Sequence, residues 1–449
     1  MKKTAVILSL LLCLLLLPAD LFVAQAAQTI YLKSETAVLM EASTGAVLFD
    51  KNMNRQMYPA SITKVMTAML ALENSDNGEL LTASHNAVYS LPYNTSHIAL
   101  GEGEQLTMEN ALYALGIESA NDAANVIAEH IGGSTENFAQ LMTQKARNIG
   151  AFNTNFTNPH GLPDNSHYTT AYDMALITAA ALKTDGITDY FSTNRYDMPP
   201  TNTRDVVRQF WNANYYINGY EECEGLLMSK TGWTEEAQHT MVTVAKRGNV
   251  TLVAVVMSSQ HKGDKFDDTT ALLDYGFANY DTITLESDAV KELLPLSLNA
   301  SNGTTLNVSR DSYLAGNFDV TVPKGKTAAD VQIKTGAAVF NEANDFATVD
   351  VELFCTGSSG SYRCGSGEVS LVMAAAEPEK QGFDFAALAQ KAVLILLAVV
   401  LWLIVGLLVF IALKQLIIIE NRRRMRKKRQ AMLRAKRQKE QQEKAVYRK

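Results

Sequence analysis

Apolar residues recur at helical spacing just after a proline near position 60. They lie three or four residues apart, so they share one face of a helix. These positions are Ile62, Val65, Met66, Met69 and Leu72. The fixed φ of Pro59 suits a first helical turn. The pattern predicts a helix that begins at Pro59.

Further helices are predicted where an apolar pattern follows a residue that can cap a helix. Thr107 precedes a helix that begins at residue 108, and a second helical run covers residues 122–131. Ser134 or Thr135 precedes a third helix, which ends near Gly150. Another follows Thr169 or Thr170. Ser119 and Asn121 then fall on a connection between helices, where such residues usually act as caps.

Short apolar runs between turn residues predict strands. Residues 37–39 and 46–49 flank a Ser-Thr-Gly turn and predict a β-hairpin. Later runs, rich in β-branched residues, cover 225–231, 240–244 and 250–257. We therefore expect an α/β (α+β) domain over residues 27–279, with an antiparallel sheet flanked by helices.

The pattern changes near residue 280. Short runs of alternating apolar residues are separated by Asn, Gly, Ser and Asp. This predicts a small all-β domain over residues 280–376, followed by a linker at 377–391. No internal repeat is visible.

Both termini suggest an exported protein. Lys2 and Lys3 precede an apolar run and a small-x-small cleavage site at Ala24-Gln25-Ala26, which predicts a signal peptide over residues 1–26. Residues 392–413 carry no charge and are numerous enough to span a bilayer as one transmembrane helix.

The distribution of charge along the chain predicts its orientation in the membrane. The overall formal charge is −7, but residues 414–449 hold 15 Lys and Arg against 3 Glu, a net of +12 that leaves −19 elsewhere. A basic tail beside a span is expected in the cytoplasm, with the preceding domains outside the cell membrane. Anionic lipid headgroups are a better expected partner for this tail than nucleic acid.

Three cysteines follow the signal peptide. Cys355 and Cys364 flank a Gly/Ser-rich turn, and an extracytoplasmic location permits a disulfide between them. Cys223 would then be free. Neither the cysteines nor the histidines show metal-ligand spacing, so no metal or cofactor is expected.

Ser61 and Lys64 are three residues apart, on one face near a helix N-terminus. The lysine amine can take the proton of the serine hydroxyl, and free N–H groups of the first turn can face developing negative charge. Ser-x-x-Lys is short, and on its own it also describes an exposed surface helix. Two further motifs favour the catalytic interpretation.

Ser61-Ile62-Thr63-Lys64, Ser119-Ala120-Asn121 and Lys230-Thr231-Gly232 occur in the order of the signature motifs of penicillin-binding proteins and serine β-lactamases. The surrounding sequence resembles the low-molecular-mass D-alanyl-D-alanine carboxypeptidases over residues 29–277. The stretches that carry this resemblance are Ala46-Val47-Leu48-Phe49, Ser119-Ala120-Asn121-Asp122-Ala123-Ala124, Asn158-Pro159-His160-Gly161-Leu162, His167-Tyr168-Thr169-Thr170-Ala171-Tyr172-Asp173 and Lys230-Thr231-Gly232-Trp233-Thr234.

The resemblance implies a role for each motif residue. Ser61 attacks the bond between two D-alanines and forms an acyl-enzyme, with Lys64 as the base. Ser119 relays a proton to the leaving amine, and Asn121 binds the substrate backbone. Lys230 and Thr231 hold the terminal carboxylate.

It also implies how the substrate and inhibitors meet the site. Gly232 lets the substrate lie close to its strand. The oxyanion hole uses the N–H groups of Ser61 and Trp233. The substrate is a peptidoglycan stem peptide ending in D-Ala-D-Ala, and β-lactams are expected to inhibit by acylating Ser61.

Two departures from the family and three alternatives stay open. The family commonly anchors through an amphipathic helix rather than a full span, and the strand before Lys230 is longer than usual. A β-lactamase is one alternative, although no Glu-x-x-x-Asn motif stands between Asn121 and Lys230. A transpeptidase is the second, although those chains usually carry larger N-terminal extensions. A non-catalytic penicillin-binding or scaffold protein of the cell-wall machinery is the third.

Overall fold

The computed structural model describes residues 30–340, 346–357, 360–372 and 385–446. The predicted signal peptide and residues 377–384 of the predicted linker lie outside this part. The chain divides into two compact units at residues 374 and 375. The first unit contains all the predicted motif residues.

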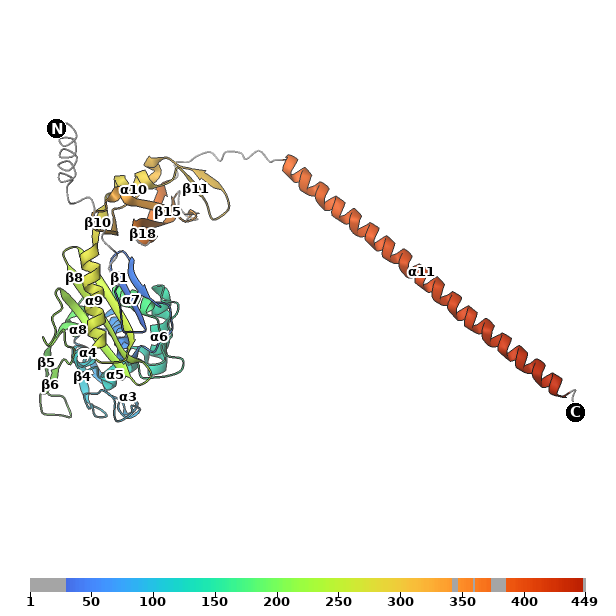
Figure 1. Cartoon of the computed structure of the whole chain (residues 1–449). Helices are drawn as coiled ribbons and strands as arrows, with labels where there is room; N and C mark the ends of the chain where they lie inside the picture. The colour runs from blue at the N-terminus through green and yellow to red at the C-terminus, as the bar shows by residue number, and fades with distance from the viewer. Residues whose placement is uncertain (1–29, 341–345, 358–359, 373–384, 447–449) are drawn as a thin grey trace, which may run out of the picture. The chain divides into compact units, whose positions relative to one another are not determined.

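A five-stranded antiparallel sheet forms the centre of the first unit, in the order β2-β1-β9-β8-β7 (Figure 1). Its strands are β1 (Thr36–Glu41), β2 (Val47–Lys51), β7 (Leu226–Thr234), β8 (Gln238–Arg247) and β9 (Val250–Ser259). The first strand of the chain therefore pairs with β9, which comes more than two hundred residues later. The predicted hairpin and the three later strands are confirmed.

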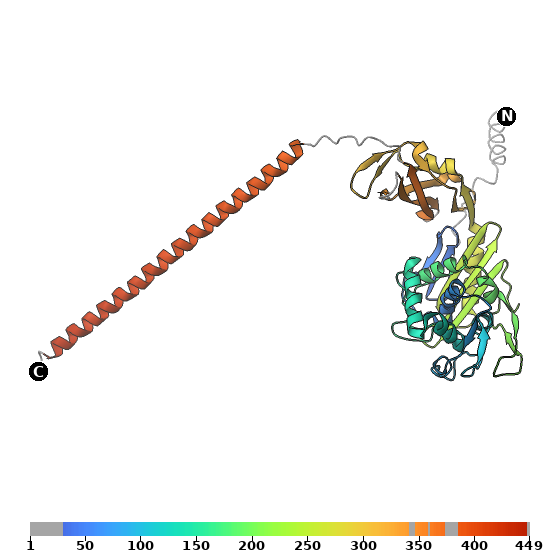
Figure 2. The ribbon, with the colours of Figure 1, turned by 180° about the vertical axis from the view of Figure 1, so that it is seen from behind.

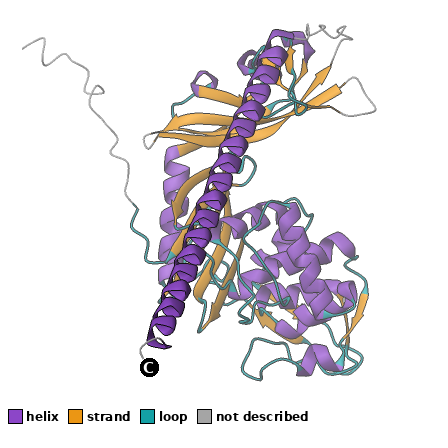
Figure 3. Cartoon of the chain, turned by 90° about the vertical axis from the view of Figure 1, so that its right-hand side faces the viewer, coloured by secondary structure: helices purple, strands orange, loops and turns teal. Residues whose placement is uncertain are grey.

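Helices cover both faces of this sheet, as Figure 3 shows. Leu39 and Leu252 pack with α9 (Asp264–Asn279) on one face. Val38 and Val255 belong to the core on the other face of the sheet. Figure 2 shows the ribbon turned by 180° from the view of Figure 1. The helices of that second layer include α2 (Lys64–Asn74), α4 (Met108–Ile117), α5 (Asn121–Gly132), α6 (Thr135–Asn148) and α7 (Ala171–Ala181). Because both faces are buried, the central strand β9 is apolar over most of its length.

The predicted helix caps are present. The side chains of Thr107, Ser134 and Thr170 each accept a hydrogen bond from a backbone N–H in the first turn of α4, α6 and α7. Of the alternatives that the sequence leaves open, Ser134 rather than Thr135 caps α6, and Thr170 rather than Thr169 caps α7. Shorter elements complete the layer: β3 (Leu80–Thr82), α3 (His85–Tyr89), β4 (Gln105–Thr107), α8 (Ile187–Ser192), β5 (Arg195–Met198) and β6 (Arg208–Trp211).

The chain after residue 280 is rich in strands and has its own apolar core, but it is not all-β. A helix, α10 (Ser287–Leu293), lies among its strands. The core includes Leu285, Val320, Val351 and Leu371. The strands are β10 (Tyr280–Leu285), β11 (Ser297–Asn299), β12 (Thr305–Asn307), β13 (Tyr313–Leu314), β14 (Phe318–Pro323), β15 (Val331–Thr335), β16 (Val339–Phe340), β17 (Phe346–Gly357) and β18 (Gly360–Val372).

This β-rich segment is joined to the sheet domain by polar contacts. The hydroxyl of Thr44, in the turn after β1, lies 2.7 Å from the hydroxyl of Thr321 in β14, and the side-chain amide of Asn249, between β8 and β9, donates to the Thr282 carbonyl of β10. Both parts belong to the first compact unit of the chain. Cys355 and Cys364 are buried here as free thiols, without the disulfide that the sequence permits.

The second unit is one helix, α11 (Phe385–Val446). It begins within the predicted linker and includes the predicted span and most of the basic tail. Among the described residues, no helix meets the length and apolarity needed to cross a membrane. The predicted span includes residues 408 and 410–413, whose side chains lie outside the described ones.

Candidate active site

Ser61 lies in a 3-10 turn, and α2 begins only at Lys64. The continuous helix predicted from Pro59 is therefore wrong for its first turn. Ala60 has a φ of +50°, in the left-handed region that alanine rarely adopts, and this conformation interrupts an α-helix. The Thr240 hydroxyl of β8 donates to the Pro59 carbonyl at 2.8 Å and holds this turn against the sheet. Strain of this kind beside a nucleophile is typical of catalytic turns.

Lys64 is fully buried, and its amine meets three oxygens. The Nζ atom lies 3.0 Å from Ser61 Oγ, 2.7 Å from Asn121 Oδ1 and 2.8 Å from the His160 carbonyl. Burial, and then the charge of Lys230, lowers the pKa of Lys64 well below its usual value. A neutral amine has two N–H donors and one lone pair. Two of the three oxygens accept hydrogen bonds, which leaves the lone pair for the hydroxyl of Ser61.

Ser119 lies between α4 and α5, as predicted, whereas Asn121 already belongs to α5. Ser119 has a φ of +57°, and Asn121 is the first residue of α5. The backbone N–H of Asn121 donates to the Ser96 carbonyl at 2.8 Å. The buried carboxylate of Asp122 accepts from the N–H groups of Ile98 and Leu100. These bonds fix the connection, so Asn121 reaches Lys64 while Ser119 faces β7.

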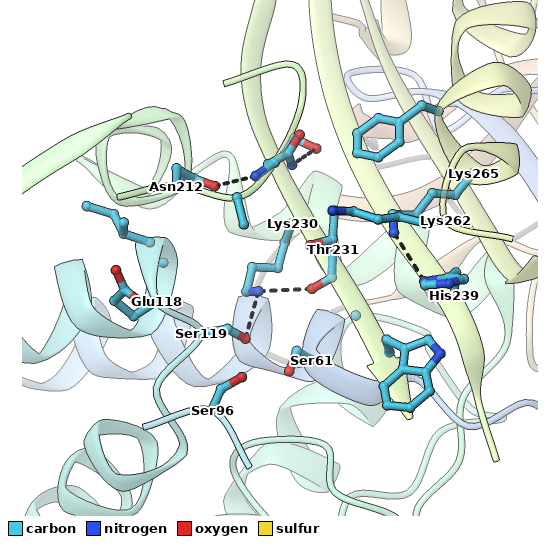
Figure 4. Close-up of a pocket in the computed structure, with 18 of the residues that line it drawn as sticks. Ser61, Ser96, Glu118, Ser119, Asn212, Lys230, Thr231, His239, Lys262 and Lys265 are labelled. Atoms are coloured by element: carbon cyan, nitrogen blue, oxygen red, sulfur yellow. Dashed lines mark hydrogen bonds between the residues drawn. The ribbon is translucent and has the colours of Figure 1, made fainter. Parts of the chain in front are cut away.

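Lys230 and Thr231 lie on β7, beside Ser119. Lys230 Nζ donates to Ser119 Oγ at 2.9 Å and to the Thr231 carbonyl at 2.9 Å (Figure 4). The unusually long strand before Lys230 is accommodated by a register shift between Leu226 and Met228. Lys230 therefore keeps its pairing with Val242 of β8 and points toward the serine turn.

Gly232 lies against the serine turn. A Cβ at this position would stand 2.8 Å from the backbone nitrogen of Ser61 and 2.5 Å from Thr240 Oγ1. The missing side chain thus lets β7 approach Ser61 itself, rather than only the substrate as the sequence suggested. The close approach brings the next residue of β7, Trp233, beside Ser61. The N–H groups of Ser61 and Trp233 are the expected pair of oxyanion donors.

Replacing Gly232 with alanine tests this contact. We expect acylation by penicillin to slow by at least about 10²-fold, because the added methyl displaces the Ser61 N–H. The free energy of unfolding should fall by about 1–3 kcal/mol through overpacking. Stopped-flow acylation and urea titration measure the two effects. Gly78→Ala is the matched control, because a Cβ there meets no atom within 4 Å. Acylation of Gly232→Ala at the wild-type rate would refute the role.

Two clefts meet at Ser61, and Ser96 and Trp233 also line both. The first, about 430 Å³, we call the lysine cleft. Its walls include Ser119, Lys230, Thr231, Trp211, His239, Lys262 and Lys265 (Figure 4). The second, about 400 Å³, has Pro92, Leu162, Glu235 and Glu236 among its lining residues. The serine is therefore open to an extended chain on both sides.

Comparison with known proteins identifies the family. A family model described as D-alanyl-D-alanine carboxypeptidase matches residues 23–261. The chain belongs to this family. It is 32% identical over 342 residues to the D-alanyl-D-alanine carboxypeptidase DacF of Bacillus subtilis, which covers 71% of this chain and 86% of that protein. It is 30% identical to DacA of Haemophilus influenzae, over 65% of this chain and 73% of that protein.

Solved structures of this carboxypeptidase family share the fold. Penicillin-binding protein 5 from Haemophilus influenzae superposes with a TM-score of 0.61 at 25% identity, over 77% of this chain and 98% of that one. The predicted penicillin-binding fold with its antiparallel sheet is thereby confirmed. Among the described residues, no group of three His, Cys, Asp or Glu could hold a metal ion.

Lys265, Lys262 and His239 line the site of this carboxypeptidase and were missed by the sequence motifs. Lys265 is buried in the first turn of α9, and its Nζ lies 3.3 Å from His239 Nδ1. Burial, then Lys262, lowers the pKa of Lys265 to about 8. Lysines near a helix N-terminus carry no distinctive sequence signal. They are recognised as residues of the site only in the structure, where β8, β9 and α9 bring them beside Lys230.

Proposed function

We propose that this chain is a serine-type D-Ala-D-Ala carboxypeptidase that removes the terminal D-alanine from peptidoglycan stem peptides. The observation that supports it most directly is the surroundings of Lys64. The two acceptors that occupy its N–H groups turn the lone pair toward Ser61 Oγ, as a general base requires. The cationic lysine cleft beside Ser61 suits a substrate with a free carboxylate.

The acylation step follows from these positions. The terminal carboxylate binds Lys230 and Thr231, and Ser61 Oγ attacks the carbonyl of the penultimate D-alanine while Lys64 accepts its proton. The oxyanion faces the N–H groups of Ser61 and Trp233. The C–N bond then breaks, and Ser119 passes a proton to the departing amine, which leaves as free D-alanine.

Deacylation reverses these roles. A water molecule gives up a proton to the active-site base and attacks the Ser61 ester. The C–O bond of the ester breaks, Ser61 regains its proton, and the shortened peptide is released with a new carboxylate. A β-lactam presents a similar acyl bond, so it should acylate Ser61 and leave slowly.

A product assay tests this proposal. The fragment from residue 27 to 379 is incubated with a synthetic pentapeptide ending in D-Ala-D-Ala, and the products are measured by mass spectrometry. The proposal requires the loss of one alanine. An unchanged peptide would refute it. Rapid hydrolysis of penicillin would favour a β-lactamase, and penicillin binding without peptide cleavage would favour a scaffold protein.

The pH profile of kcat/KM should reflect two lysines that act in opposite protonation states. Burial, then Lys265, lowers the pKa of Lys230 to about 7, so its carboxylate-binding ammonium form is lost as the pH rises through that value. Lys64 acts in its neutral form, so kcat/KM should also fall at acid pH. In Lys230→Arg, which stays charged, the alkaline limb should move to higher pH. An unmoved alkaline limb in steady-state measurements would exclude Lys230 as its source.

We also propose that residues 392–413 anchor the catalytic unit outside the bacterial cell membrane, with residues 414–449 in the cytoplasm against anionic lipid. The support is the uncharged sequence of residues 392–413, along which Leu394, Leu401 and Trp402 are exposed in α11, next to basic residues that include Arg422. The test compares alkaline extraction of membranes that hold the full chain or a chain ending at residue 384. Extraction of both to the same extent would refute the anchor.

A further inference from the structure

The lysine cleft holds more positive charge than one terminal carboxylate requires. Lys230 and Lys265 line it while only 4% and 3% exposed, and Lys262 lies at its edge. Within the described part of the chain, none of the three forms an ion pair. Buried cations without a carboxylate partner are costly in a folded protein, unless a ligand supplies the negative charge.

The cleft itself offers these lysines almost no negative charge. Glu118 is the one carboxylate among its described lining residues, and its Oε1 accepts the backbone N–H of Trp211 at 2.9 Å. Glu118 is therefore engaged with β6, on the wall that carries Trp211. The lysines remain available to a ligand that enters from Ser61.

The three lysine side chains have different contact partners, so their positive charges lie at different places in the cleft. Lys230 donates to Ser119 Oγ and the Thr231 carbonyl, while Lys265 reaches His239. The ammonium of Lys262 stands 4.5 Å from the centre of the Tyr215 ring, a cation–π contact that holds it in place. Figure 4 shows Lys262 and Lys265 on the far side of Thr231 from Ser119.

The cleft is also large for the residue that must leave it. It has a volume of about 430 Å³, and Asn214 and Phe266 line it together with Lys230 and Thr231. The side chain of a terminal D-alanine is a single methyl group. Once its carboxylate is bound at Lys230 and Thr231, the part of the cleft near Lys262 remains unfilled.

We infer that this cleft accepts a terminal D-residue with an acidic side chain, such as D-glutamate, and that Lys262 binds the second carboxylate. The inference rests on the proposed carboxypeptidase reaction and extends its substrates. The chemistry is unchanged: Ser61 forms the same acyl-enzyme, and the amine that leaves is that of the acidic residue. A basic terminal residue is disfavoured because its ammonium would face three lysines.

Four peptides that differ only in the terminal D-residue test this inference: D-Ala, D-Glu, D-Gln and D-Lys. D-Glu and D-Gln have the same shape and differ in charge, so their ratio of kcat/KM isolates the electrostatic contribution. We expect D-Glu to be preferred over D-Gln by about fivefold, the size of one exposed ion pair. The ratio should decline as salt is added. The D-Lys peptide should be the poorest substrate.

Lys262→Met should bring the D-Glu to D-Gln ratio close to one. Lys246→Met, an exposed lysine on β8 outside the cleft, should keep the wild-type ratio. Equal cleavage of the D-Glu and D-Gln peptides by the wild type, or a preference that survives Lys262→Met, would overturn the inference. Failure to cleave the D-Ala peptide would refute the carboxypeptidase proposal itself, so the two failures are distinguishable.

Discussion

Replacing Ser61 with alanine is expected to abolish both peptide cleavage and penicillin binding. Every covalent step of the proposed reaction passes through Ser61 Oγ, which lies 3.0 Å from Lys64 Nζ. Removing a nucleophile of this kind costs about 10⁴-fold or more in turnover. Release of D-alanine from a pentapeptide should fall below detection, and the intact mass of the protein should not increase after incubation with penicillin.

The fold should survive this change, because the Ser61 side chain is only half-buried and alanine fits the same turn. Circular dichroism and the melting temperature of Ser61→Ala should match the wild type. Ser90→Ala, an exposed serine outside both clefts, controls for the loss of a hydroxyl and should form the penicillin adduct normally. A covalent adduct in Ser61→Ala would mean that another residue is the nucleophile.

The sequence predicted much of this site because its chemistry lies in short local motifs. Ser61, Lys64, Ser119, Asn121 and Lys230 are each within hydrogen-bond distance of another member of the set. The strands of the antiparallel sheet could also be predicted, since β-branched runs at residues 240–257 are long and bounded by turns. The contribution of β1 depended on the hairpin signal around Gly45.

What the sequence did not reveal depends on contacts between distant segments. The 3-10 turn at Ser61 is stabilised by Thr240, which lies 181 positions after the Pro59 carbonyl that it contacts, so periodicity alone favoured a plain helix. The packing role of Gly232 likewise requires knowing that β7 touches the serine turn. Lys262 and Lys265 enter the site only through the pairing of β8 with β9. Local pattern carries no information on such contacts.

Lys64→Met is the second change with a large expected effect. The methionine has nearly the same length but offers no lone pair, so Ser61 loses the group that takes its proton. A positioned general base contributes about 10²–10⁴-fold, so we expect the acylation rate to fall by at least about 10³-fold. Acylation by a fluorescent penicillin under single-turnover conditions measures this directly.

The same change should also alter the free energy of unfolding. The sign of that change shows whether Lys64 is buried as a cation or as a neutral, hydrogen-bonded amine. An ammonium buried without a counter-ion would make methionine stabilising. A neutral amine, as the lowered pKa indicates, instead leaves the Asn121 side-chain oxygen and the His160 carbonyl without their donor. Each such loss costs about 1–3 kcal/mol, so the free energy of unfolding should decrease. Lys183→Met, at an exposed position just after α7 and outside both clefts, should change neither quantity. Wild-type acylation by Lys64→Met would rule out Lys64 as the base, whereas slow acylation with raised stability would show that it is buried as the cation.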